Sequence, residues 1–137
     1  MIKVIIIEDE IPSQRLLKET LQEIDVKTEV VCCLNSMKSA VKWFQNNPHP
    51  DIVLLDIQLS DGLSFEIFKQ VTIESSIIFT TAFDEYAIQA FKVNSIDYLL
   101  KPVEKGELQT AFEKYNEFNK QFVKDQNSHI NFKELAS

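Results

Sequence analysis

The chain has 137 residues, 45% hydrophobic and 26% charged, which is typical of one folded domain and not of a disordered chain. Its 21 acidic and 14 basic residues give a net charge of −7, which argues against direct binding of a nucleic-acid backbone, because that requires basic side chains. The sequence has no apolar run of transmembrane length, and its start, MIKVIII, lacks the leader and cleavage site of a signal peptide. We therefore expect a cytoplasmic protein that does not bind membranes.

Apolar, mostly β-branched segments alternate with amphipathic segments along the chain. The apolar segments predict buried strands over residues 2–7, 29–34, 52–56, 77–81 and 96–100. The amphipathic segments predict helices over residues 12–24, after a cap at Asn35 or Ser36, after a turn at Asp61-Gly62, over 84–93 and from 104 onwards. Five strand–helix units of this kind predict an α/β fold, a doubly wound parallel sheet with helices on both faces.

The end of the folded domain is expected near residue 122. The last predicted helix carries apolar residues on one side as far as Phe122. The sequence that follows, VKDQNSHINFKELAS, is polar and weakly patterned. We therefore predict one domain over residues 1–122 and a linker or disordered tail over 123–137.

Polar residues stand at the carboxyl ends of the predicted strands, where parallel α/β sheets bind their ligands. Glu8 and Asp9 follow the first strand, and Asp56 ends the third. If these strands are neighbours, Asp9 and Asp56 converge, and two carboxylates about 4 Å apart repel by about 4 kcal/mol at an effective dielectric of 20. A divalent cation would offset this repulsion. Oxygen ligands without His or Cys favour Mg²⁺.

A carboxylate beside a metal ion, a hydroxyl and an ammonium group is suited to phosphoryl transfer. In this interpretation Asp56 is the nucleophile and Asp9, helped by Glu8, holds the metal. Thr81, at the end of the fourth strand, and Lys101, after the fifth, bind the phosphoryl oxygens. Each residue alone has a plainer explanation, as a helix cap, a strand-end hydroxyl or a surface lysine. Four chemically matched residues at one sheet edge favour the functional interpretation.

Four motifs resemble those of response-regulator receiver domains of two-component signalling over residues 2 to about 120. They are IIIEDE, VLLDIQLSDG, IIFTTA and DYLLKP. The run TAFDEYAIQAFKVNSIDYLLKPV most resembles receivers attached to LytTR-type DNA-binding domains. The resemblance implies a flavodoxin-like sheet with strand order 2-1-3-4-5 and five helices on its two faces.

The resemblance also implies a role for each matching residue. Asp56 would accept a phosphoryl group from a sensor histidine kinase. Glu8, Asp9, Asp56 and the backbone carbonyl of Gln58 would hold Mg²⁺, although the family often has Asp where Glu8 stands. Lys101 matches the active-site lysine, and its bond to Pro102 is typically cis in the family.

Thr81 and Tyr98 match the family's switch pair. Tyr98 turns inward when the Thr81 hydroxyl moves toward the phosphoryl group, whereas the plainer alternative for Tyr98 is a half-buried sheet residue. We expect phosphorylation to favour a homodimer formed by the fourth helix, fifth strand and fifth helix. Phe83 is expected near the path of the water that hydrolyses the acyl phosphate. DNA would be contacted only through a C-terminal domain outside this chain.

The sequence argues against two other functions and leaves a third open. A nucleotide-binding enzyme needs a glycine-rich phosphate loop, and the chain has only Gly62 and Gly106. An aspartyl-phosphate phosphatase generally has a second acid two residues after its nucleophile, where this chain has Gln58. A receiver-like binding module that is never phosphorylated stays open. We therefore expect an autocatalytic phosphoacceptor and not a turnover enzyme.

Overall fold

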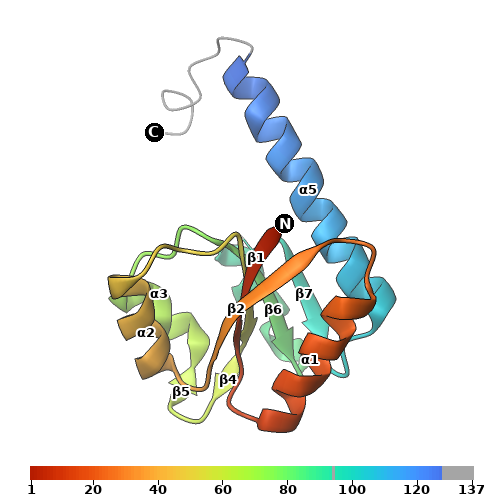
Figure 1. Ribbon diagram of the computed structural model, residues 1–137. Helices are drawn as coiled ribbons and strands as arrows, with labels where there is room; N and C mark the ends of the chain where they lie inside the picture. Colours follow the sequence, from red (N-terminus) through yellow and green to blue (C-terminus); the bar gives the residue numbers. More distant parts are fainter. Residues whose placement is uncertain (94, 128–137) are drawn as a thin grey trace.

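The computed structural model describes residues 1–93 and 95–127. Five of its strands form one parallel sheet, and α-helices cover both faces of that sheet (Figure 1). The sheet strands are β1 (Ile2–Ile7), β2 (Thr28–Leu34), β3 (Ile52–Asp56), β6 (Ser76–Thr81) and β7 (Asp97–Leu100). The helices are α1 (Ile11–Glu23), α2 (Met37–Asn46), α3 (Ile67–Gln70), α4 (Ala87–Lys92) and α5 (Lys105–Asn127).

The order of the sheet strands is β2-β1-β3-β6-β7, and neighbouring strands pair in parallel. This is the predicted order 2-1-3-4-5, because β4 and β5 form a separate hairpin. The flavodoxin-like doubly wound fold is therefore confirmed. In this order β1 and β3 are neighbours in the middle of the sheet, so the acidic residues after them are brought to one edge.

The core consists of two apolar layers, one on each face of the sheet. On one face, alternate strand residues such as Ile6, Leu54 and Ile78 pack against α1 and α5. On the other face, residues such as Phe79 pack against α2, α3 and α4. Burial on both faces explains why the strands read as continuous apolar runs.

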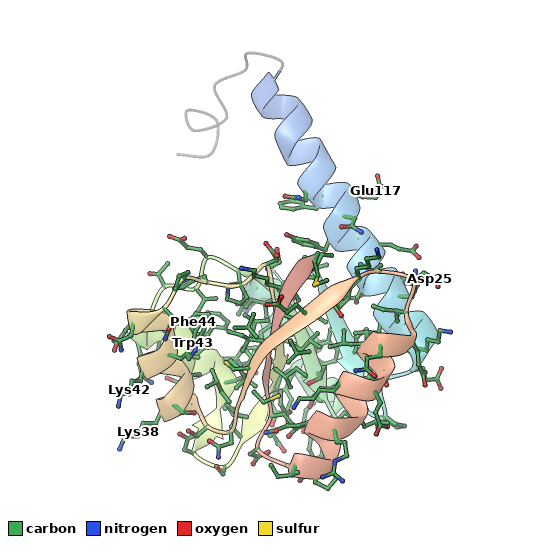
Figure 2. The ribbon with its side chains drawn as sticks, in the orientation of Figure 1. Asp25, Lys38, Lys42, Trp43, Phe44 and Glu117 are labelled. Carbon is green, nitrogen blue, oxygen red and sulfur yellow. The ribbon has the colours of Figure 1, made fainter. Side chains whose placement is uncertain are left out.

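Helix α2 illustrates how the outer layer is built. The Ser36 hydroxyl caps it by accepting a hydrogen bond from the backbone N–H of Ser39 at 3.0 Å. In Figure 2, Lys38 and Lys42 extend from this helix toward solvent, whereas Phe44 of the same helix is 3% exposed and belongs to the core. The amphipathic pattern therefore orients α2 on the sheet.

The predicted helix directly after the Asp61-Gly62 turn is wrong in its extent. Gln58–Leu59 (β4) pairs antiparallel with Gly62–Leu63 (β5), and a 3₁₀ turn over Ser64–Glu66 precedes the short α3. Gly62 has φ of 132°, a value that favours glycine, and this permits the tight hairpin. The Asp61 carboxylate accepts hydrogen bonds from the N–H groups of Met37 (2.9 Å) and Lys38 (3.0 Å), which anchors the hairpin to α2.

The remaining boundaries differ by a few residues. The predicted helix 84–93 begins as a 3₁₀ turn, Asp84–Tyr86, followed by α4. Helix α5 continues past residue 122 to Asn127, while residues 128–137 of the predicted tail lie outside the described residues. The domain boundary at 122 stays a prediction. Within residues 1–93 and 95–127, no helix combines the length and apolar character needed to cross a bilayer.

Candidate functional site

Three charged side chains from three strands meet at the carboxyl edge of the sheet. The Lys101 ammonium, just after β7, donates hydrogen bonds to Oε1 of Glu8 and, at 2.9 Å, to Oδ2 of Asp56. Glu8 is 1% exposed and Asp56 5% exposed, so both carboxylates are buried. The plainer explanation of Lys101 as a surface lysine is therefore wrong. The peptide bond from Lys101 to Pro102 is cis, as the resemblance implies.

A third carboxylate completes an acidic cluster. One carboxylate oxygen each from Glu8, Asp9 and Asp56 lie within 4.8 Å of one another. Beside them is a pocket of about 410 Å³, which Asp9 and Asp56 share with residues from β4 and the end of β6. Its lining residues are Asp9, Glu10, Asp56, Gln58, Leu59, Thr81, Ala82, Phe83 and Lys101. Asp56 and its partner Lys101 therefore both border an accessible space.

The cluster carries more negative charge than Lys101 offsets. Burial, together with the negative charge of Asp56, raises the pKa of Glu8 to about 7 despite its hydrogen bond to Lys101. Burial alone would lower the pKa of Lys101, but its hydrogen bonds to Glu8 and Asp56 outweigh burial and the pKa is raised. Lys101 is thus cationic, and its single positive charge does not neutralise all the carboxylates of the cluster.

These donors fit a hard divalent cation such as Mg²⁺. The cluster offers carboxylate oxygens and contains neither a thiolate nor an imidazole. The backbone N–H of Gln58 donates to Oδ1 of Asp56 at 3.2 Å, so this residue lies at the cluster and lines the pocket. The role of its carbonyl as a metal ligand stays a prediction.

The predicted switch residues are joined through one residue between them. The Thr81 hydroxyl, fully buried, accepts a hydrogen bond from the backbone N–H of Phe83 at 3.2 Å. The Tyr98 hydroxyl donates to the backbone carbonyl of the same Phe83. Tyr98 is half-buried on β7. The Phe83 backbone is therefore a physical connection between the pocket and the face that carries Tyr98.

Several contacts at this site were not predicted from the sequence. The sequence predicts a metal-binding role for Glu8, and the structure shows that Glu8 also binds Lys101. The Gln58 side chain donates to the Tyr86 hydroxyl at 3.0 Å. Both contacts join residues far apart in the chain, and no local pattern in the sequence indicates them. Glu10 occupies the N-cap position of α1, but its side chain makes no capping hydrogen bond.

Comparison with known proteins agrees with this geometry. Residues 4–113 match the response regulator receiver domain family. The chain is 37% identical over 121 residues to the sensory transduction protein LytT of Bacillus anthracis, covering 84% of this chain and 47% of that protein. It is 33% identical over 144 residues to LytT of Bacillus subtilis, where the shares are 99% and 57%. The chain thus spans about half the length of the curated relatives it matches.

A solved structure shows the same architecture. The crystal structure of the response regulatory domain of protein mrkE from Klebsiella pneumoniae aligns with a TM-score of 0.76 at 28% sequence identity. The alignment covers 87% of this chain and 98% of that one. Fold, site geometry and sequence similarity lead to one conclusion: this chain belongs to the response-regulator receiver domain family.

Proposed function

We propose that this receiver domain accepts a phosphoryl group on Asp56 from a sensor histidine kinase, in a Mg²⁺-dependent reaction. The observation that carries the proposal is the position of Asp56. Its carboxylate is held by Lys101, lies within 4.8 Å of carboxylate oxygens of Glu8 and Asp9, and borders the pocket. No other carboxylate in the described residues combines these three properties.

The proposed transfer is a displacement at phosphorus. A carboxylate oxygen of Asp56 attacks the phosphorus atom of a phosphohistidine, and the P–N bond breaks with its electron pair on the imidazole nitrogen. In the later hydrolysis step, water attacks the phosphorus atom, the P–O bond to Asp56 breaks, and inorganic phosphate leaves. In this proposal the domain is a phosphoacceptor that removes its own phosphoryl group, and not a turnover enzyme.

Glu8, Asp9, Asp56 and the Gln58 carbonyl would hold Mg²⁺, which when bound supplies positive charge to the phosphoryl oxygens. Lys101 contributes a second positive charge, because its ammonium already lies against Asp56 at the same pocket. Thr81, at the rim of the pocket, would donate its hydroxyl to a phosphoryl oxygen. Together these groups neutralise the charge that builds up during transfer.

Movement of Thr81 would reach Tyr98 through Phe83. If the Thr81 hydroxyl turns toward a phosphoryl oxygen, it no longer accepts the Phe83 N–H, and the backbone that also holds Tyr98 is released to move. This supports Thr81 and Tyr98 as a switch pair that changes the face of α4, β7 and α5. We propose that this face forms a homodimer in the phosphorylated state.

The similarity to LytT proteins supports the rest of the proposal. About half of each of those proteins lies outside the part matched by this chain. We propose that the receiver, over residues 1–122, is joined by the following segment to a LytTR-type DNA-binding domain and controls transcription from the cytoplasm. The chain's own charge of −7 is consistent with leaving DNA contacts to that domain.

Intact mass spectrometry after incubation with acetyl phosphate and Mg²⁺ tests the proposal. One added phosphoryl group is expected on the wild type and none on Asp56→Ala or in the presence of a chelator. Asp51→Asn is a matched control, because Asp51 lies at the opposite end of the same strand and binds the backbone N–H of Lys3. Addition of phosphate to Asp56→Ala, or none to the wild type, would contradict the proposal.

A further inference from the structure

A second hydroxyl residue lies beside the site. Thr80 is the direct neighbour of Asp56 across the β3–β6 pairing and of Leu99 across the β6–β7 pairing. Side chains alternate between the faces of a sheet, so Thr80 shares the face of Ile78, and Asp56 shares that of Leu54. Both of those apolar residues belong to the layer under α1 and α5. Thr80 and Asp56 therefore lie side by side on one face.

The Thr80 hydroxyl has no partner. The residue is fully buried, and its Oγ1 makes no hydrogen bond within the described residues. A buried hydroxyl without a partner is destabilising, and valine would fill the same space without that penalty. A hydroxyl kept at this position is explained if it gains a partner in another state of the domain.

Lys101 is the group that can supply this partner. Its strand, β7, is separated from β3 and β1 by β6, yet its ammonium reaches Asp56 on β3 and Glu8 after β1. The Lys101 side chain must therefore cross β6, where Thr80 is the last strand residue on that face. An ammonium has three N–H groups, and Glu8 and Asp56 take two of them.

Phosphorylation would bring the ammonium back over β6. The pocket beside Asp56 is bordered by Thr81, Ala82 and Phe83, so a phosphoryl group there lies over the carboxyl end of β6. Lys101 would follow the phosphoryl oxygens, and Glu8 would be engaged as a metal ligand. The ammonium then loses Glu8 as a partner, and an N–H group that the phosphoryl oxygens do not take needs a new acceptor close to β6.

We propose that Thr80 is a positioning residue for the phosphorylated state, whose hydroxyl oxygen accepts a hydrogen bond from Lys101 once Asp56 carries a phosphoryl group. This inference rests on the proposed function. It assigns Thr80 no contact with the phosphoryl group itself. The hydroxyl holds the ammonium over the phosphoryl oxygens and costs stability in the unmodified protein.

Two substitutions at Thr80 separate the hydroxyl from the shape of the side chain. Thr80→Val keeps the branched shape and removes the hydroxyl, whereas Thr80→Ser keeps the hydroxyl and removes a methyl group. The probe is beryllofluoride with Mg²⁺, a mimic of the phosphoryl group, with its Kd measured by calorimetry. Thermal unfolding without beryllofluoride reports the resting state.

Loss of the Thr80 hydroxyl is expected to weaken beryllofluoride binding without lowering the unfolding temperature. Thr80→Val should unfold at a temperature equal to or above that of the wild type and bind beryllofluoride about tenfold more weakly, the effect of one hydrogen bond to a charged group. Thr80→Ser should unfold at a lower temperature and keep wild-type affinity. The Lys101 ammonium protons should exchange more slowly with water in the beryllofluoride complexes of the wild type and Thr80→Ser than in that of Thr80→Val.

Ser64→Ala is the matched control. Ser64 also has a fully buried hydroxyl without a partner in the described residues, but its backbone N–H binds the Ile57 carbonyl, and it follows the hairpin after β3. This variant should keep wild-type affinity for beryllofluoride. A lost affinity here would show that removing any buried hydroxyl disturbs the site, which overturns the inference.

Other outcomes are equally decisive. Equal binding by the wild type and Thr80→Val would overturn the role of Thr80 while leaving the proposed function intact. A lower unfolding temperature for Thr80→Val would show that the hydroxyl is already paired at rest, for example with a buried water molecule, and would also overturn the inference. Failure of the wild type to bind beryllofluoride or to accept phosphate would instead contradict the proposed function.

Discussion

Thr81 and Tyr98 are both hydrogen-bonded to the backbone of the same residue, Phe83. The Thr81 hydroxyl accepts the Phe83 N–H, and the Tyr98 hydroxyl donates to the Phe83 carbonyl. A movement of the short segment around Phe83 is therefore enough to transmit a change in the pocket to Tyr98 on β7. Coupling of this kind is carried by an element with two arrangements, and the segment from Thr81 to Phe83 is suited to that role.

Tyr98→Phe tests this coupling. The variant loses the hydrogen bond to Phe83 but keeps the ring, so phosphoryl transfer from acetyl phosphate should proceed as in the wild type. The increase in mass caused by beryllofluoride in sedimentation should be smaller, because the dimer face no longer follows the pocket. Thr20→Val, which removes a hydroxyl from α1, outside that face, is the control. An unchanged wild-type mass with and without beryllofluoride would refute the proposed dimer.

Phe83→Ala is expected to shorten the lifetime of the phosphorylated protein severalfold. The Phe83 side chain is 44% exposed and lines the pocket, so its removal opens the approach of water to phosphorus. The decay of the phosphorylated mass after removal of acetyl phosphate measures the lifetime. Leu16→Ala removes a similarly exposed apolar side chain from α1, outside this pocket. An unchanged or longer lifetime for Phe83→Ala would rule out shielding by this ring.

Lys101→Met should slow phosphoryl uptake from acetyl phosphate by about a hundredfold, as expected for the loss of a charged donor at the reacting group. The substitution removes the positive charge bound to Glu8 and Asp56 and keeps much of the side-chain volume. Lys114→Met is the control, because Lys114 pairs with Asp97 on the surface, at 3.0 Å. Circular dichroism should show that both variants are folded. Equal rates for Lys101→Met and the wild type would remove Lys101 from the mechanism.

Asp61→Ala should lower the free energy of unfolding by about 1 kcal/mol, the usual effect of losing a helix cap. Although slight burial opposes the shift, the hydrogen bonds from Met37 and Lys38 lower the pKa of Asp61 below 3.8. Its contribution is therefore fully present above about pH 4 and is lost as the pH falls through the lower, folded-state pKa.

Urea unfolding at several pH values checks this expectation. The wild type and Asp61→Ala should differ at pH 7 and converge in stability in strong acid. Ser60→Ala, in the same turn, should match the wild type throughout. A difference that grows toward acid pH would have the wrong sign for a carboxylate that accepts two backbone hydrogen bonds.

The sequence alone determined the strands and the chemical character of their ends. Parallel strands buried on both faces must be continuous apolar runs, and this local property made β1 and β3 readable. The carboxyl ends of parallel strands meet at one edge, so Asp56, Thr81 and Lys101 were recognised as candidate partners without any knowledge of distances.

The tertiary structure decided which of the residues at those strand ends contact one another. The hydrogen bond between Lys101 and Glu8 connects the ends of β7 and β1, and the contact of Asp61 with Met37 joins the β4–β5 turn to the start of α2. The hairpin of β4 and β5 replaced the start of a predicted helix, because pairing and the cap on α2 outweigh the local helical pattern. The unpaired Thr80 hydroxyl is likewise a fact of packing. Each of these features is set by which distant groups come within hydrogen-bond reach, and only the folded chain brings them there.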